Sequence, residues 1–392
     1  ADLRTAAETT HFLLKSDRYP LTGTGDLDLY PLFAEHNTAI TGRRGRAGFI
    51  TPTGLAVDKT RSAFFRNLTS TSRLAVFYDF INGGMFFPAV GAMVRFSASV
   101  ITGDASDDLK LAFLNTNTTD IPSRLINLTA ADALRINPNT GTLPLLADQR
   151  DADILAAVYR RFPVIRRDED PDGNPWDVSP RRMFDMTNDA GLFAELDALA
   201  SGRPDGHARI LEGVRYLPLY EGKHFWLYDH RYATSEGVQD PDKPRNFAVN
   251  EQANPSVEVQ PRYWVKESEV QAWYGPLWGE ATWEIAFRGN ARATDARTMV
   301  VAVIPKSACG NAAPLLRLYQ AEQTASLVAV WSSLVFDFVA RQKMSGPNMN
   351  FFILDQIATP TPSDLAAATP FDPALSWADW LRPRVLELTY TS

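Results

Sequence analysis

The chain has 392 residues, of which 45% are hydrophobic and 22% charged, a balance typical of a folded globular protein. No run approaches about 18 consecutive apolar residues, so no membrane-spanning helix is expected. The single cysteine, Cys309, excludes an internal disulfide framework and suits a cytoplasmic protein. The net charge of −7 argues mildly against nucleic-acid binding, although arginines gather at 43–46, 160–167 and 181–182. Such clusters either neutralise phosphates or are plain solvated surface charge.

The first hundred residues alternate between helical and strand patterns. Asp28 is placed to cap a helix that runs to about Ile40, and Asp58 to cap a second helix that ends at about Leu68. This part predicts the end of a mostly parallel sheet with an antiparallel edge. Because three strands and two helices cannot cover both faces of a doubly wound sheet, it resembles half of a domain. The predicted strands are 47–50, 74–78 and 93–101.

Beyond residue 105 the pattern becomes a mixture of α and β. A Pro- and Asp-rich loop at 168–180 and a Pro/Thr-rich linker at 358–372 interrupt it. Apolar residues at helical spacing predict helices at 151–162, 190–200, 325–343 and 376–386. Short apolar or aromatic runs predict strands at 216–220, 225–228, 283–287, 298–304 and 351–354. The predicted fold class is therefore α/β with a mixed α+β remainder.

Two clusters have the composition of a metal site but lack its spacing. The Asp-rich run at 168–172 imitates the start of a calcium loop, but Pro171 interrupts it, and Ser179 stands where a bidentate Glu is needed. His224 and His230 have no third ligand at a suitable spacing. No metal site is therefore expected.

Four stretches follow one another along most of the chain. The first is 28–33 (DLYPLF) with 45–52 (GRAGFITP), and the second is 79–82 (DFIN) with 86–88 (FFP) and 94–96 (VRF). The third is 174–177 (NPWD) with 181–187 (RRMFDMT). The fourth comprises 217–223 (LPLYEGK), 229–231 (DHR), 288–297, 304–305 (IP) and 348–351 (NMNF). Together they resemble gamma-class adenine DNA methyltransferases, especially the large enzymes of restriction and phage-exclusion (BREX-like) systems.

The resemblance implies a division of the chain into three parts. Residues 1–105 would be the C-terminal part of the catalytic domain, which is the C-terminal half of a Rossmann-like methyltransferase sheet. Residues 106–205 would be a helical connector, and residues 206–392 a target-recognition domain. The parent enzyme would be an S-adenosylmethionine-dependent adenine-N6 methyltransferase that flips its target base out of double-stranded DNA, in restriction-modification or phage defence.

Two hallmarks of the family are absent from the sequence. No Gly-rich turn follows a strand pattern, and neither Asn-Pro-Pro-Tyr nor Asp-Pro-Pro-Tyr occurs. In the family, both precede the first stretch that matches here. We therefore expect a C-terminal portion that needs the N-terminal half of the methyltransferase as a partner, binds no S-adenosylmethionine by itself and is inactive alone.

The resemblance also implies site residues. Phe87, on the Phe-Pro turn, would stack on the flipped adenine, with Phe86 as its nearest rival; alternatively, both rings close the sheet edge as core aromatics. In the recognition part, Arg or Lys would read guanine and Asn would read adenine. Arg341 and Lys343 equally suit the capping of a helix end. The candidates for DNA contact are Lys223, Arg231, Arg288, Arg292, Arg297, Arg341, Lys343, Asn348 and Asn350.

Two other functions stay open at the level of sequence. One is a non-catalytic DNA-specificity or DNA-binding subunit that recruits a separate catalytic subunit. The other is a glycan-binding or structural protein, suggested by nine tryptophans in aromatic strand patterns. The amphipathic helix pattern at 325–343 and the α/β start argue against the second.

Overall fold

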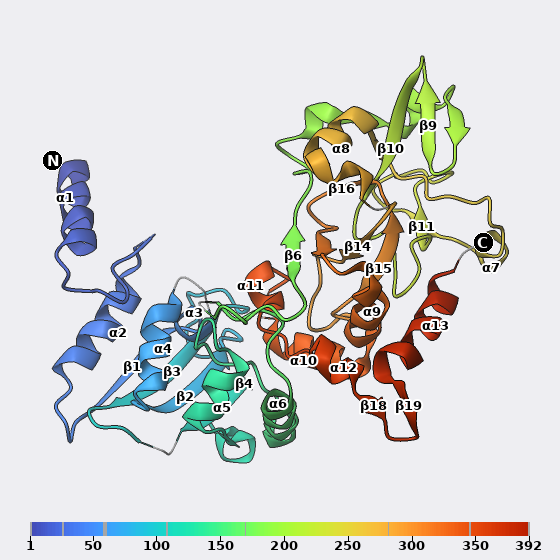
Figure 1. The fold of residues 1–392 in the computed structure, drawn as a ribbon. Coiled ribbons are helices and arrows are strands. Elements are labelled where there is room, and N and C mark those ends of the chain that lie inside the picture. Colours follow the sequence, from blue (N-terminus) through green and yellow to red (C-terminus); the bar gives the residue numbers. More distant parts are fainter. Residues whose placement is uncertain are drawn as a thin grey trace. The chain divides into compact units, whose positions relative to one another are not determined.

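The computed structural model describes residues 2–25, 27–57, 61–106, 109–168, 170–280, 282–344 and 346–390. The chain forms two compact units (Figure 1). Unit 1 is Ala1–Asp170 with Asp355–Ala358, and unit 2 is Pro171–Leu354 with Thr359–Ser392. The expected boundaries at 105 and 205 therefore fall inside unit 1 and unit 2, and the assignment of functions to the three parts stays a prediction.

Unit 1 is built on one mixed sheet. Its strands are β1 (Arg46–Pro52), β2 (Leu74–Ile81), β3 (Arg95–Thr102), β4 (Lys110–Asn115) and β5 (Ile126–Asn127), in the order β1-β3-β2-β4-β5. β3 pairs antiparallel with both β1 and β2, β4 pairs parallel with β2, and β5 pairs antiparallel with β4. The three strands expected in the first hundred residues are confirmed.

The expectation of a mostly parallel sheet is wrong for the described strands. β1 and β2 run in the same direction, but β3 lies between them and pairs antiparallel with each. The helices between β1 and β2 in the sequence allow these two strands to be parallel with one strand position between them. The loop after β2 reverses the chain, and β3 occupies that position.

The helices of unit 1 are α1 (Asp2–Lys15), α2 (Leu29–Ile40), α3 (Gly54–Val57), α4 (Ser62–Ser70), α5 (Ala130–Ile136) and α6 (Gln149–Arg161). Asp28 occupies the N-cap position of α2, but its carboxylate pairs with Arg61 at 2.8 Å and makes no cap hydrogen bond. Asp58, the expected cap of the second helix, lies outside the described residues. The helix expected at 151–162 is α6.

The sheet of unit 1 is well buried on one face and half open on the other. On the buried face, Phe65 of α4 packs edge-on against Phe77 of β2, with ring centroids 6.0 Å apart. On the opposite face, Tyr78 and Val100 are half-buried, and Ile50 of β1 is 60% exposed. Among the described residues, β1 pairs only with β3. Ile50 thus stays exposed on this face, although α2 and α3 contact β1.

Unit 2 contains several small sheets. One has the order β7-β13-β10-β9-β8, with β16 beside β10, and another has the order β15-β14-β17-β6. β11 pairs with β12, and β18 with β19. The strands are β6 (Val178–Arg181), β7 (Phe193–Glu195), β8 (Arg203–Asp205), β9 (Ala208–Leu211), β10 (Val214–Tyr220), β11 (Ala233–Thr234), β12 (Arg245–Asn246), β13 (Tyr263–Lys266), β14 (Trp283–Phe287), β15 (Val301–Pro305), β16 (Ala308–Cys309), β17 (Leu315–Leu318), β18 (Ala368–Thr369) and β19 (Asp372–Ser376).

The helices of unit 2 are mostly short. They are α7 (Val249–Gln252), α8 (Glu267–Tyr274), α9 (Thr324–Ser332), α10 (Leu334–Lys343), α11 (Phe351–Leu354), α12 (Pro362–Ala366) and α13 (Trp377–Thr389). No single helix in the described part of the chain is long and apolar enough to cross a membrane. The stretch from Ala321 to Lys343 meets the same length and composition test only as a pair of helices bent by 67°.

Several expected elements of unit 2 differ from those observed. Residues 190–200 form 3₁₀ turns around β7 instead of a helix, because this segment pairs with β13. Residues 225–228 form no strand, and Phe351–Leu354 is helical. The helix expected at 325–343 breaks at Ser333, whose hydroxyl accepts a hydrogen bond from the Phe336 amide and caps α10. The strands expected at 216–220 and 283–287 are confirmed as β10 and β14.

Candidate nucleic-acid interface

In unit 1, one buried side chain organises the loop that joins β2 to β3. Asn82 is fully buried, and its amide nitrogen donates to the carbonyl oxygens of Phe87 at 2.9 Å, Val90 at 2.8 Å and Gly91 at 3.3 Å. Its side-chain oxygen accepts the Phe87 amide hydrogen at 2.9 Å. The chain leaves Asn82 through Gly83, whose φ of 57° lies in the left-handed region that favours glycine. The loop is therefore folded around Asn82.

The aromatic residues of this loop differ in exposure. Phe86 is half-buried and packs against the rings of Phe80 and Phe96, at centroid distances of 5.3 and 5.2 Å. Phe87 touches Phe96 edge-on at 5.0 Å and is 39% exposed. Both candidate rings thus contact the cluster at the sheet edge, but Phe87 presents more surface to solvent.

Asp79 connects the strand ends beside this loop. Its buried carboxylate accepts hydrogen bonds from the Thr53 hydroxyl at 2.6 Å, the Leu114 amide at 2.9 Å and the Arg95 guanidinium. Its carbonyl oxygen accepts from Asn115 at 2.8 Å. Through these bonds, Asp79 connects the carboxyl ends of β1, β2 and β4 to the start of β3. The Asn82 loop begins at the carboxyl end of β2, on the same side of the sheet as the ends of β1 and β4.

The Gly-Thr-Gly segment of unit 1, residues 23–25, lies between α1 and α2. Gly23 and Gly25 lie in turns between α1 and α2, and no strand precedes them. The Gly23 amide donates to the Tyr19 carbonyl at 2.7 Å, so this glycine closes a local turn. The described residues of this segment form a loop between two helices.

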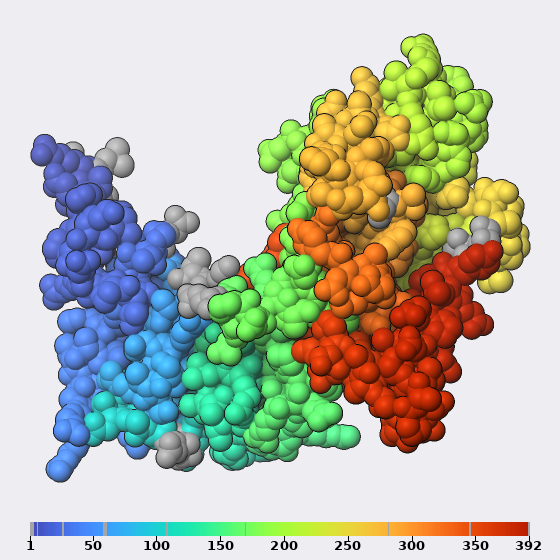
Figure 2. Space-filling model, in the orientation of Figure 1, coloured from blue at the N-terminus to red at the C-terminus, as the bar shows by residue number. Residues whose placement is uncertain are grey.

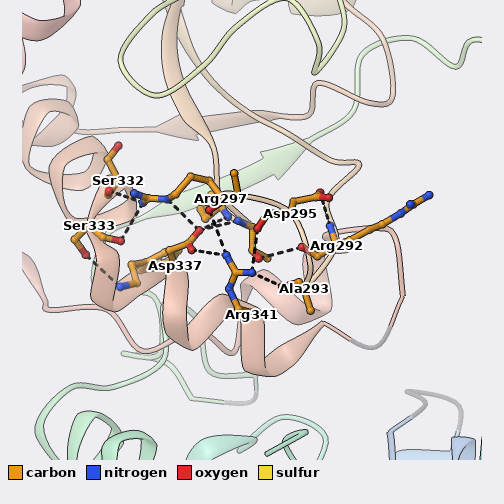
Figure 3. Close-up of polar contacts among 12 residues, drawn as sticks. Arg292, Ala293, Asp295, Arg297, Ser332, Ser333, Asp337 and Arg341 are labelled. Atoms are coloured by element: carbon orange, nitrogen blue, oxygen red, sulfur yellow. Dashed lines mark hydrogen bonds and ion pairs between the residues drawn. The ribbon is translucent and has the colours of Figure 1, made fainter. Parts of the chain in front are cut away.

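In unit 2, two of the arginines expected to contact DNA, Arg297 and Arg341, pair with Asp337 of α10 (Figure 3). Arg297 donates to the Ser332 carbonyl at 2.6 Å and pairs with Asp337 at 3.3 Å. Arg341 pairs with Asp337 at 3.1 Å and donates to the Asp295 carbonyl at 3.0 Å. These two guanidinium groups therefore fasten the loop between β14 and β15 to the corner between α9 and α10.

Arg292 behaves differently from the other two. Its backbone takes part in the loop, because its amide donates to the Asp295 carboxylate at 2.9 Å. Its guanidinium extends away from the Asp337 network in Figure 3, and the described residues offer it no hydrogen bond or ion pair. Asn290, at the start of the same loop, is also exposed. The loop between β14 and β15 thus exposes the Arg292 guanidinium and the Asn290 side chain to solvent.

A cleft of about 440 Å³ adjoins this loop. Lys223 lies in it, paired with Glu221 at 3.0 Å. Arg288 is held in its wall by the Gly222 carbonyl at 2.7 Å and lies over the Trp226 ring at 4.7 Å, and burial lowers the pKa of its guanidinium. The residues that line the cleft are Glu221, Gly222, Lys223, Tyr232, Ala233, Asp242, Pro244, Asn246, Arg288, Asn290 and Ala312.

The remaining expected residues divide between this surface and the interior. Asn348 is exposed and forms a β-bridge with Asn290, whereas Asn350 is half-buried at the start of α11 and accepts from Arg182 at 3.5 Å. Arg231 is buried and donates to three backbone carbonyls, two of them those of Asn254 and Val257. Lys343 is half-buried in the last turn of α10, and desolvation lowers its pKa well below its usual range.

The cleft brings Lys223, Arg288 and Asn290 together, Asn348 forms a bridge with Asn290, and exposed Arg292 follows Asn290 in the same loop. We call Lys223, Asn290, Arg292 and Asn348 the polar surface. Sequence reasoning missed Asn290, Asn246 and the organising role of Asn82. The only signal for Asn82 was its place before Gly83 and Gly84, a turn sequence directly after a strand. In the described residues, no group of three or more His, Cys, Asp or Glu is placed to hold a metal ion.

Comparison with known proteins gives only distant likenesses. No family model and no curated protein matches the chain. A type IIG restriction endonuclease, BpuSI, aligns at 12% identity over 99% of this chain and 47% of its own, with a TM-score of 0.33. The DNA complex of the type IIL restriction-modification enzyme MmeI aligns at 11% identity over 96% of this chain and 50% of its own, with a TM-score of 0.45.

The DNA-bound type ISP restriction-modification enzyme LlaBIII is more distant, with 10% identity, coverage of 79% and 22%, and a TM-score of 0.24. This chain spans at most half the length of these three enzymes. Because all three TM-scores lie below 0.5, they do not establish a shared fold.

Proposed function

We propose that this chain is part of a site-specific, S-adenosylmethionine-dependent adenine-N6 DNA methyltransferase of the restriction-modification or phage-defence kind, and that it contributes base stacking and target recognition. The observation that carries the proposal is the Asn82-centred loop, which holds the partly exposed Phe87 ring beyond the carboxyl ends of a sheet with an open edge. The resemblance of the flanking sequence to gamma-class enzymes gives the reaction class.

The chemistry explains why such a ring is needed. The exocyclic amine of adenine lies inside the duplex, so the enzyme must rotate the base out of the stack. A flipped base loses its stacking partners, and an aromatic side chain restores about 1–3 kcal/mol of that interaction. Phe87 is 39% exposed and rests on Phe96, so one part of the ring is supported while another is open to a base.

The cofactor and the polar group that accepts the amine proton must come from a partner. The sequence of this chain contains neither a Gly-rich turn after a strand pattern nor an Asn-Pro-Pro-Tyr motif. A complementary methyltransferase half would dock on the open β1 edge and on an exposed apolar stripe of α2, formed by Leu29, Phe33 and Ile40 at 67%, 63% and 66% exposure. Apolar stripes of this kind mark interfaces. In Figure 2 the dark blue atoms of α1 and α2 form one end of unit 1.

Unit 2 would read the DNA sequence. The polar surface combines Lys223 and Arg292, which suit guanine or phosphate, with Asn290 and Asn348, whose carboxamides suit adenine. In this proposal Arg297 and Arg341 act indirectly, because their guanidinium groups hold the loop that carries Asn290 and Arg292. Arg231 has a structural role, since its donors are used by backbone carbonyls.

Equilibrium binding of a mixed-sequence library of duplex DNA tests the recognition part. We expect the chain to bind duplex DNA with an affinity that falls steeply as salt rises, and to enrich a subset of sequences from the library. Replacement of Asn290 by Ala should weaken the selection while leaving the chain folded. If the chain binds no duplex at low salt, unit 2 has no recognition role.

A second function, that of a non-catalytic DNA-specificity subunit, is favoured by one observation. The polar surface is built entirely from residues of unit 2, so it needs nothing from the Phe87 loop. Sequence-selective DNA binding that is unaffected by Phe87→Ala, together with no methylation when a complementary half is supplied, would support this function instead.

A further inference from the structure

The β2–β3 loop is closed by hydrogen bonds along its length. The Asn82 and Gly83 amides donate to the carbonyls of Val94 at 2.9 Å and Ala92 at 2.8 Å. Farther out, the Val90 amide donates to the Phe87 carbonyl at 3.0 Å. Together with the Asn82 side chain, these bonds fix a segment that has no helix or strand of its own.

The loop nevertheless exposes large apolar side chains. Met85 is 73% exposed, Met93 is 85% exposed and Phe87 is 39% exposed. The Phe86 and Phe87 rings pack on Phe96, but Met85 and Met93 lack such cover, so the polar contacts of Asn82 add to the packing in ordering the loop. Phe87 is the residue held most directly, because Asn82 binds both its amide and its carbonyl group.

We infer that Asn82 is a positioning residue that acts through Phe87, presetting the ring in the conformation in which it receives a base. The identity of that base as adenine rests on the proposed function, whereas the fixing of Phe87 does not. A ring that is already ordered loses little conformational entropy when the base arrives, so the stacking energy is expressed as affinity.

The carboxamide is the only side-chain chemistry of this length that fits the site. Asn82 donates to three carbonyl oxygens and accepts from one amide. A carboxylate would keep the acceptor but face the same carbonyls without a donor. Alanine would remove these four side-chain contacts, leaving the Phe87 amide without its acceptor and the Phe87 carbonyl with the Val90 amide alone.

The test places 4-fluorophenylalanine at position 87 of the full chain and records its ¹⁹F spectrum. We expect one narrow resonance in the otherwise unchanged chain, and a broadened or split resonance after Asn82→Ala. Asn82→Asp should give an intermediate spectrum. Asn115→Ala is the matched control, because Asn115 is equally buried at the same strand ends but bonds to the Asp79 carbonyl and not to the loop.

Titration with a single-stranded oligonucleotide containing adenine, against one with an abasic site at the same position, separates positioning from function. We expect adenine to shift the resonance, and Asn82→Ala to weaken this response by about fivefold or more, since stacking on one ring is worth about that factor. A narrow, unmoved resonance in Asn82→Ala, with circular dichroism showing a folded chain, overturns the inference. The resonance of the unchanged chain could fail to shift with adenine and still broaden after Asn82→Ala. That result would support the positioning role of Asn82 and overturn adenine stacking on Phe87.

Discussion

At the scale of single residues, buried polar side chains hold the segments that face solvent at both candidate sites. Asn82 organises the loop that carries Phe87. Asp337 accepts the amides of Thr298 and Met299 at 2.8 and 2.9 Å and pairs with two arginines, which fixes the loop that carries Arg292. The exposed group and the buried group thus have separable roles, which substitution can distinguish.

In unit 2, substitution of Arg292 tests the role of the exposed group, and substitution of Arg297 tests the role of the buried contacts. We expect Arg292→Ala to weaken duplex binding and to reduce the slope of log affinity against log salt by about one, with no change in the free energy of unfolding. Arg297→Ala should lower the free energy of unfolding by about 2 kcal/mol, because it leaves the Ser332 carbonyl and part of the Asp337 carboxylate unpaired in a partly buried site.

Urea unfolding measures the stability of both variants, and titration with duplex DNA at several salt concentrations measures their affinity. The result that contradicts these roles is a loss of stability in Arg292→Ala, or an unchanged stability in Arg297→Ala.

At the scale of elements, the exposed stripe of α2 provides a test of docking. Leu29 and Phe33 are 67% and 63% exposed, so replacing both by Ser should leave the stability of the chain nearly unchanged. The same change should abolish or strongly weaken association with a complementary methyltransferase half, as measured by analytical ultracentrifugation. The matched control replaces Leu334 and Val335 of unit 2, which are 76% and 58% exposed, and should keep full association. Equal loss in both pairs would show non-specific adhesion.

Element prediction from the sequence succeeded where the local pattern and the tertiary environment agree. β2 and β14 combine apolar runs with buried neighbours, and α6 has both an Asp148 cap and a buried stripe. The pattern failed at 190–200, where pairing with β13 overrides helical spacing, and at Phe351–Leu354, where four apolar residues fit either state. The order of the strands was beyond reach, because nothing local places β3 between β1 and β2.

The candidate sites were predictable only in part for a similar reason. Phe87 and Arg292 follow from residue type and the resemblance, and both prove exposed. Arg231, Arg297 and Arg341 look the same in the sequence, yet their donors serve backbone carbonyls. Burial and partner choice depend on contacts between distant segments, so a single sequence could not separate the two groups of arginines.

At the scale of the whole molecule, buried histidine makes stability depend on pH. Burial lowers the pKa of His224 from 6.5 to about 3, so only the unfolded chain takes up a proton there as pH falls from 6.5 towards 3. The free energy of unfolding of unit 2 should therefore fall with decreasing pH in this window, by up to about 1.4 kcal/mol per pH unit for this group. His230, whose pKa burial lowers to about 4, acts in the same direction.

Urea unfolding at pH 7.5, 6.0 and 5.0 measures this dependence. In the unchanged chain, the Glu221 amide donates a hydrogen bond to the His224 ring at 3.0 Å. His224→Asn keeps an acceptor for this amide but has no side chain that titrates in this pH range. Its stability should change less with pH than that of the unchanged chain. Parallel curves for the two proteins would exclude His224 as a source of the dependence.

We propose that this chain completes an adenine methyltransferase and does not methylate by itself. The most direct measurement is transfer of a labelled methyl group from S-adenosylmethionine to duplex DNA, with the product base identified by mass spectrometry. We predict no transfer by the chain alone, N6-methyladenine when a half carrying the Gly-rich turn and Asn-Pro-Pro-Tyr is added, and a large loss with Phe87→Ala. A folded, associated mixture that methylates no adenine, or full activity with Phe87→Ala, would contradict the account.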